Sequence, residues 1–233
     1  MCMSCGSLSV RPSRRTVLMG GLAALAAGTL PLAAQPADET VDPDAALQRL
    51  LEGNARYVSG NRTNTDFSAG RAERALSQRP FAAILSCADS RVSPELAFDQ
   101  GPGDLFVVRL AGNFVSDDGL ASLEYAVNFL GTRLIMVLGH SNCGAVDAAI
   151  KVVRDNIELP GHLPEMLREI KPAAELALAS GGDVLNTAIT ENVRLGVSRL
   201  TTAQPIIAGQ VASGNVKIVG GVYDLATGAV GLV

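Results

Sequence analysis

Two short segments of the sequence carry side chains that can bind a metal ion and activate water. One contains Cys87, Asp89 and Arg91, and the other contains His140 and Cys143. Two thiolates and one imidazole form a ligand set that suits zinc, and three protein ligands leave a fourth tetrahedral position open for water. We therefore expect Cys87, His140 and Cys143 to hold one catalytic Zn²⁺ per subunit.

Asp89 and Arg91 are the predicted catalytic pair beside that metal. A guanidinium two residues from a carboxylate orients it and keeps it ionised. The carboxylate of Asp89 can then accept a hydrogen bond from zinc-bound hydroxide and direct an oxygen lone pair at the substrate. Because two thiolates cancel the charge of zinc, such help matters more here than beside three neutral imidazoles.

Each of these residues also has a simpler interpretation. A buried cysteine is often a small hydrophobic residue, and an Asp-x-Arg pair is often an ion pair in a loop. Cys87 and Cys143 could also form one disulfide in an exported protein. The metal site is favoured because both segments follow predicted strands, so that their side chains meet at one place.

The predicted strands are continuous apolar runs. Residues 81–86 lead into the first segment and residues 133–139 into the second, with a third run at 104–112. A helical repeat over 117–131 separates the last two runs, and this βαβ order predicts a parallel sheet covered on both faces. Ligands bind at the carboxyl ends of strands in open α/β sheets, where both segments should lie.

The rest of the chain completes an α/β fold. We expect a central, mainly parallel sheet of about four parallel strands plus an antiparallel edge strand, flanked by helices and preceded by an N-terminal helical arm. Two β-rich runs separated by Thr227 and Gly228 predict a last strand and hairpin near the C-terminus. Further helical patterns occur at residues 43–58, 146–153, 164–180 and 184–202.

The first 36 residues have the layout of an export signal. Arg14 and Arg15 precede an uncharged run from Thr16 to Pro36, an arrangement similar to the twin-arginine type. The alternative is a membrane anchor or buried helix, but the run is rich in Ala and Gly and only weakly apolar. We expect residues 1–36 to be a signal peptide, and residues 37–233 to be a single periplasmic or extracellular domain without a membrane anchor.

The composition excludes a nucleic-acid binder. The formal net charge is −4, and no cluster of Lys and Arg occurs outside the N-terminal region. Proteins that bind nucleic acid need such a cluster to neutralise phosphates. Hydrophobic residues make up 48% and charged residues 18% of the chain, so a sizeable core is expected instead.

The two segments resemble the signatures of the β-class carbonic anhydrases. The matching stretches are "CADSRVSP" and "EYAVNFLGTRLIMVLGHSNCGA", with "GDLFVVRLAGN" between them, in the family's order and spacing. The resemblance extends from the first predicted helix to the C-terminus. It implies that Cys87, His140 and Cys143 bind zinc and that Asp89 and Arg91 form the dyad beside the metal.

The resemblance also implies the substrate pocket, the assembly and the reaction. Gln78 matches an amide that hydrogen-bonds substrate, and Phe106, Ala111 and Tyr125 match positions lining a narrow apolar pocket, some of them from a neighbouring subunit. The implied active unit is a homodimer or a dimer of dimers that interconverts CO₂ and bicarbonate by attack of zinc-bound hydroxide. The alternatives are a hydrolase of a CO₂ analogue such as CS₂ or COS, and a non-catalytic zinc-binding or disulfide-stapled protein.

Overall fold

The structure is a computed structural model that describes residues 41–233. The predicted signal peptide, residues 1–36, lies outside the described residues, so both it and the domain boundary that follows stay predictions. Within 41–233, every helix is too short or too polar to cross a membrane.

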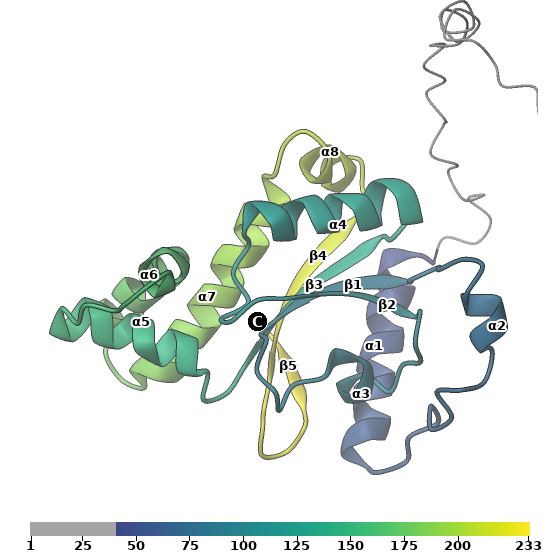
Figure 1. The fold of residues 1–233 in the computed structure, drawn as a ribbon, viewed down its shortest axis with the longest axis horizontal. Helices are drawn as coiled ribbons and strands as arrows, with labels where there is room; N and C mark the ends of the chain where they lie inside the picture. The colour runs from purple at the N-terminus through teal and green to yellow at the C-terminus, as the bar shows by residue number, and fades with distance from the viewer. Residues whose placement is uncertain (1–40) are drawn as a thin grey trace, which may run out of the picture. The chain divides into compact units, whose positions relative to one another are not determined.

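Five strands form one sheet in the order β2-β1-β3-β4-β5 (Figure 1). The first four strands in this order pair in parallel, and β5 pairs antiparallel with β4. This arrangement confirms the predicted fold class. The strands are β1 (Ala82–Ser86), β2 (Leu105–Arg109), β3 (Leu134–His140), β4 (Lys217–Tyr223) and β5 (Val230–Leu232).

The two central strands are buried along their whole length. Every residue of β1 and of β3 is buried, because helices cover both faces of the sheet. This is why their sequences are continuous apolar runs rather than alternating ones. Ser86, the last residue of β1, pairs with Leu138, two residues before the end of β3. The chain segments that follow the two strands therefore emerge at the same edge of the sheet.

Helices divide into two layers and a projecting group (Figure 1). One core cluster packs α1 and α3 against one sheet face, and a second packs α4, α7 and α8 against the other. A third cluster joins α5, α6 and α7 and includes Cys87 and Cys143. The helices are α1 (Pro43–Val58), α2 (Arg71–Arg74), α3 (Pro94–Ala97), α4 (Asp117–Leu130), α5 (Gly144–Asp155), α6 (Leu163–Ser180), α7 (Val184–Thr201) and α8 (Ile207–Ala212).

Local signals set the ends of the long helices. The side chain of Asp42 accepts a hydrogen bond from the Asp44 N–H, which caps α1, and Ser116 caps α4 in the same way through the Gly119 N–H. Gly131 ends α4 in the left-handed conformation, with a φ of 71°. The helices expected at 43–58, 117–131, 146–153, 164–180 and 184–202 are confirmed by α1, α4, α5, α6 and α7.

The third apolar run ends as a strand earlier than predicted. We expected it to extend to residue 112, but β2 ends at Arg109. Leu110 still donates its N–H to the Ser86 carbonyl and accepts from the Ala88 N–H, but its carbonyl also accepts from the Asn113 N–H, which closes a turn. Gly112 lies in this turn with a φ of +85°. The apolar run therefore outlasts the strand because the chain turns after Leu110, with Ala111 exposed and Gly112 buried.

A buried carboxylate, Asp99, fixes the end of α1 and the loop that follows it. Its side chain is fully buried and accepts hydrogen bonds from Arg56 Nε at 2.6 Å, from the Thr63 hydroxyl at 2.9 Å and from the Asn64 N–H at 2.9 Å. Burial opposes ionisation, but the hydrogen bonds from Thr63, Arg56 and Asn64 outweigh it and hold the pKa of Asp99 well below its usual range.

Replacing Asp99 by Asn should lower the free energy of unfolding by about 3 kcal/mol at neutral pH, because Arg56 would lose its buried partner. The pKa of Asp99 is depressed by folding, so its stabilisation is present above the unfolded pKa of about 3.9 and is lost in more acidic solution. In urea titrations, the difference from the unsubstituted protein should therefore shrink as the pH falls below about 4.

Glu175→Gln is the matched control for this prediction. Glu175 and Lys171 form an exposed ion pair at 3.6 Å on α6. Such pairs contribute little, so this substitution should change the free energy of unfolding by less than about 0.5 kcal/mol. Equal effects of the two substitutions would contradict the structural role of Asp99.

Candidate metal centre

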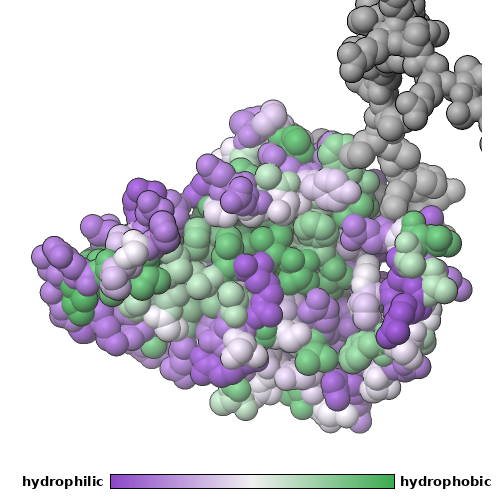
Figure 2. All heavy atoms as spheres, in the orientation of Figure 1, coloured by the Kyte–Doolittle hydropathy of each residue, from purple (hydrophilic) through white to green (hydrophobic). Residues whose placement is uncertain are grey.

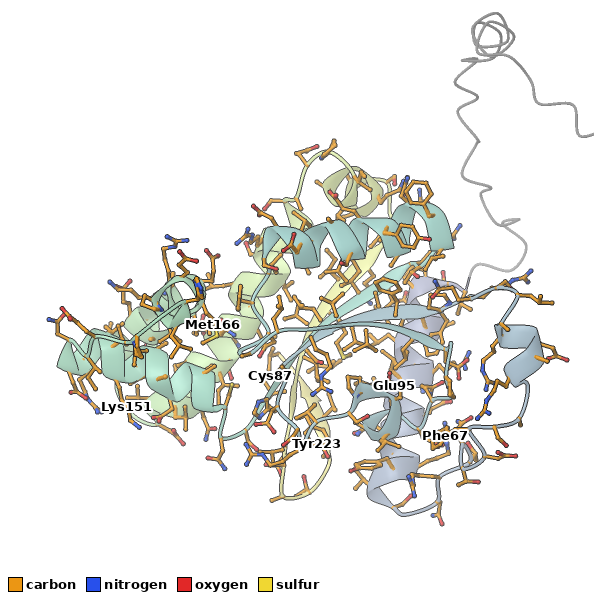
Figure 3. The ribbon with its side chains drawn as sticks, viewed as in Figure 1. Phe67, Cys87, Glu95, Lys151, Met166 and Tyr223 are labelled. Carbon is orange, nitrogen blue, oxygen red and sulfur yellow. The ribbon has the colours of Figure 1, made fainter. Side chains whose placement is uncertain are left out.

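Cys87, His140 and Cys143 lie together at the carboxyl edge of the sheet. Figure 3 marks the position of Cys87. Cys87 follows β1 directly, His140 is the last residue of β3, and Cys143 precedes the first residue of α5. One ligand atom from each lies within 4.8 Å of the others, and all three residues are buried. The two sulfurs are 4.0 Å apart, about twice the length of a disulfide bond. Both cysteines are therefore free.

The tautomer of His140 leaves one nitrogen available to a metal. Nδ1 lies 2.9 Å from the Ser141 carbonyl oxygen, which can only accept, so Nδ1 carries the proton. Among the described residues, Nε2 is one of two buried side-chain polar atoms without a hydrogen-bond partner. Such an atom costs free energy unless something binds it. An imidazole whose second nitrogen donates to a carbonyl is the usual arrangement of a metal-binding histidine, so these residues fit zinc.

Each sulfur affects the ionisation of the other. The contact between Cys87 Sγ and Cys143 Sγ, in which either atom can be the donor, lowers the pKa of Cys87. This effect outweighs burial and is reinforced by the Gly112 N–H at 3.2 Å. The same contact raises the pKa of Cys143. A metal ion that binds both sulfurs requires both as thiolates, so its binding would displace their protons.

Asp89 and Arg91 form a bidentate ion pair beside this group. Arg91 donates from Nε to Asp89 Oδ1 at 2.9 Å and from Nη2 to Asp89 Oδ2 at 2.7 Å. These hydrogen bonds hold the pKa of Asp89 well below its usual range. Asp89 Oδ2 lies 3.8 Å from His140 Nε2. The dyad thus keeps an ionised carboxylate next to the ligand atoms, with the guanidinium turned towards solvent.

Arg109 supports the same segment and was not predicted from the sequence. Its Nε donates to the Cys87 carbonyl oxygen at 3.1 Å, and its Nη2 donates to the Asp89 carbonyl oxygen at 2.6 Å. One side chain at the end of β2 therefore holds the backbone of both a ligand and a dyad residue. A charged residue at the end of an otherwise apolar run was the available signal.

The four predicted pocket residues occupy different places. Ala111 is exposed and adjoins the ligand group through Gly112. Gln78 is exposed and precedes the amino end of β1. Phe106 pairs with Ala83, about 10 Å along the sheet from the carboxyl end of β1. The ring of Tyr125 lies 6.4 Å from that of Phe106. The aromatic pair therefore lies along the β2 edge and not around the ligand atoms of its own chain.

The carbonic anhydrase family model matches residues 82–230. The fold aligns with the solved structure of the β-carbonic anhydrase CcaA with a TM-score of 0.65 and 30% sequence identity. The alignment covers 80% of this chain and 94% of the CcaA chain. The chain belongs to the β-class carbonic anhydrases. It is therefore an enzyme, and the residues of both signatures lie inside the matched region.

Curated relatives match this β-class carbonic anhydrase along most of their length. It is 39% identical over 188 residues to carbonic anhydrase 2 of Mycobacterium tuberculosis, covering 80% of this chain and 91% of the relative. It is also 39% identical, over 193 residues, to a carbonic anhydrase of Mycolicibacterium smegmatis, covering 82% of this chain and 93% of the relative. The Coccomyxa β-carbonic anhydrase, solved with acetazolamide, aligns with a TM-score of 0.63 at 30% identity, covering 80% and 86%.

Replacing Cys143 by Ser should reduce the zinc content of the purified β-class carbonic anhydrase to near zero, because a neutral hydroxyl is a poor substitute for a thiolate ligand. Metal analysis by mass spectrometry on protein of known concentration measures this. Ala148→Ser adds the same hydroxyl on α5 without removing a ligand atom, and it should retain zinc. Full occupancy in the Cys143→Ser protein would remove this residue from the ligand set.

Proposed function

We propose that the protein catalyses the reversible hydration of CO₂ to bicarbonate and a proton, with one Zn²⁺ per subunit held by Cys87, His140 and Cys143. The observation that carries the proposal is the buried Cys-His-Cys group, whose unpartnered Nε2 lies 3.8 Å from the carboxylate of Asp89. A buried structural site would have no need of an ionised carboxylate held at this position.

Zinc, when bound, supplies a Lewis acid that acidifies water near neutral pH. The protein supplies orientation. Asp89, kept ionised by Arg91, can accept a hydrogen bond from the attacking oxygen and aim its lone pair at the carbon of CO₂. The new C–O bond forms as one C=O π bond of CO₂ becomes a carboxylate oxygen. One proton of the attacking water stays on the bicarbonate, and the other passes to solvent.

The named relatives favour CO₂ over its sulfur analogues. The curated proteins from Mycobacterium tuberculosis and Mycolicibacterium smegmatis are both carbonic anhydrases and match most of this chain. The dyad of Asp89 and Arg91 also distinguishes the site from that of a non-catalytic zinc protein, which would have no need of such a pair and would close the metal with a fourth protein ligand.

Asp89→Asn should retain zinc but reduce the rate of CO₂ hydration by at least about 100-fold, because an amide cannot keep the charged bidentate contact with Arg91. Stopped-flow hydration with a pH indicator, together with zinc analysis on the same sample, separates loss of chemistry from loss of metal. Asp118→Asn makes the same chemical change at an exposed position of α4 and should leave the rate unchanged. An unchanged rate in Asp89→Asn would show that the dyad is only structural.

We further propose that the active unit is a homodimer formed through the β2 edge. β2 is one of the two edge strands and pairs on one side only, with β1. Apolar side chains gather over β2 and the adjoining part of α4 (Figure 2). Among them the Tyr125 ring lies 5.3 Å from Phe129, and the two side chains are 41% and 38% exposed. A second copy would cover this edge and explain why the predicted pocket aromatics lie away from the ligands of their own chain.

Phe129→Asp should therefore convert the dimer, or dimer of dimers, into monomers and abolish most of the activity. A buried carboxylate at the interface would lack a partner. Size-exclusion chromatography with light scattering gives the mass directly. Leu176→Asp places the same charge at a residue of α6 that is 47% exposed, and it should keep the unsubstituted mass. A monomeric unsubstituted protein, or an unchanged mass in Phe129→Asp, would contradict the proposed interface.

A further inference from the structure

Asn192 is a polar side chain in the apolar stripe of α7. It is only 3% exposed, and its neighbours on the buried face of the helix include Ile189, Val193 and Gly196. An amide in such a place destabilises the fold unless it finds a hydrogen-bond partner. Its presence therefore indicates a specific partner in the interior.

That partner is the backbone of Gly112, in the turn after β2. Asn192 Nδ2 donates to the Gly112 carbonyl oxygen at 2.7 Å, in a fully buried contact between residues far apart in the chain. The N–H of the same glycine donates to Cys87 Sγ at 3.2 Å. Asn192 thus holds the carbonyl group of Gly112, and the N–H of the same residue contacts the sulfur of Cys87.

Gly112 requires such support because of its backbone conformation. Its φ of +85° is one that other residues rarely adopt, and an added Cβ would lie 2.4 Å from Ile170 Cδ1. Glycine is therefore needed here, yet glycine is also the residue with the most conformational freedom. A buried hydrogen bond to its carbonyl removes that freedom and fixes the direction of the N–H.

We propose that Asn192 is a positioning residue of the metal site, which locks Gly112 so that its N–H stays directed at the sulfur of Cys87. Groups outside the ligand set orient ligands and tune the metal that they bind. A donor aimed at a thiolate stabilises the charged form and withdraws electron density from the sulfur. The inference rests on the proposed zinc function and adds to it a residue from another helix.

Asn192→Leu tests this inference, because leucine is of similar size, suits the apolar face and cannot donate. Chelator competition should show zinc affinity weaker by about 10-fold or more. In the Co²⁺-substituted protein, the sulfur-to-cobalt charge-transfer band should move to longer wavelength, since a thiolate without its donor releases electron density more easily. Circular dichroism establishes that the variant is folded; if it is not, Asn192→Ala is judged by the same two measurements.

Val193→Ala is the matched control. Val193 is the next residue of α7 and packs near Gly139 and Gly220 of the sheet, so its truncation loosens the helix without touching Gly112. It should keep the zinc affinity and the cobalt band. Unchanged affinity and band in the Asn192 variant, or an equal loss in Val193→Ala, would overturn the inference. Failure of the unsubstituted protein to bind zinc would instead overturn the proposed function.

Discussion

The parallel pairing of β1 with β3 is the constraint on which the rest of the site depends. It brings Cys87 and His140, which are distant in the sequence, to the same edge of the sheet, where Cys143 joins them at the start of α5. A slip of one residue in this pairing would turn every side chain of a strand to the opposite face. The complete burial of both strands makes such a slip costly, so the core fixes the geometry of the ligand group.

A buried group of thiols and imidazole needs further partners, and each comes from a different element. Ser141 fixes the tautomer of His140, Gly112 donates to Cys87, and Arg109 holds the backbone around Asp89. These contacts leave His140 Nε2 without a hydrogen-bond partner, beside two sulfurs that lie 4.0 Å apart. A divalent cation that prefers sulfur and nitrogen would bind all three atoms together.

The sequence predicted those features that depend on local pattern or on residue type. Continuous apolar runs identified the central strands, helical periodicity identified α1, α4, α5, α6 and α7, and the unusual residue types after two strands identified the ligand group. The support contacts could not be predicted in this way. Asn192 and Arg109 act on backbone atoms of distant turns, and nothing in their own neighbourhoods specifies those partners. The end of β2 was misjudged because the chain turns directly after the strand, at Leu110 and Ala111, which continue the apolar run.

The assembly marks another limit of prediction from one chain. Periodicity places Phe106 on a strand and Tyr125 on a helix, and the structure brings their rings together. In a single chain Tyr125 is 41% exposed and Phe106 is partly buried, and the homodimer that we propose would cover both. In that assembly the pocket expected around the metal would draw on both subunits, whereas the ligand group lies within one subunit.

X-ray absorption at the zinc edge of the purified protein would identify the atoms that bind the metal. We expect one zinc per chain, with two sulfur neighbours at about 2.3 Å and two lighter neighbours, an imidazole nitrogen and an oxygen, at about 2.0 Å. A zinc shell with no sulfur, or one with four sulfurs, would contradict the assignment of Cys87, His140 and Cys143 as the protein ligands of an open catalytic site.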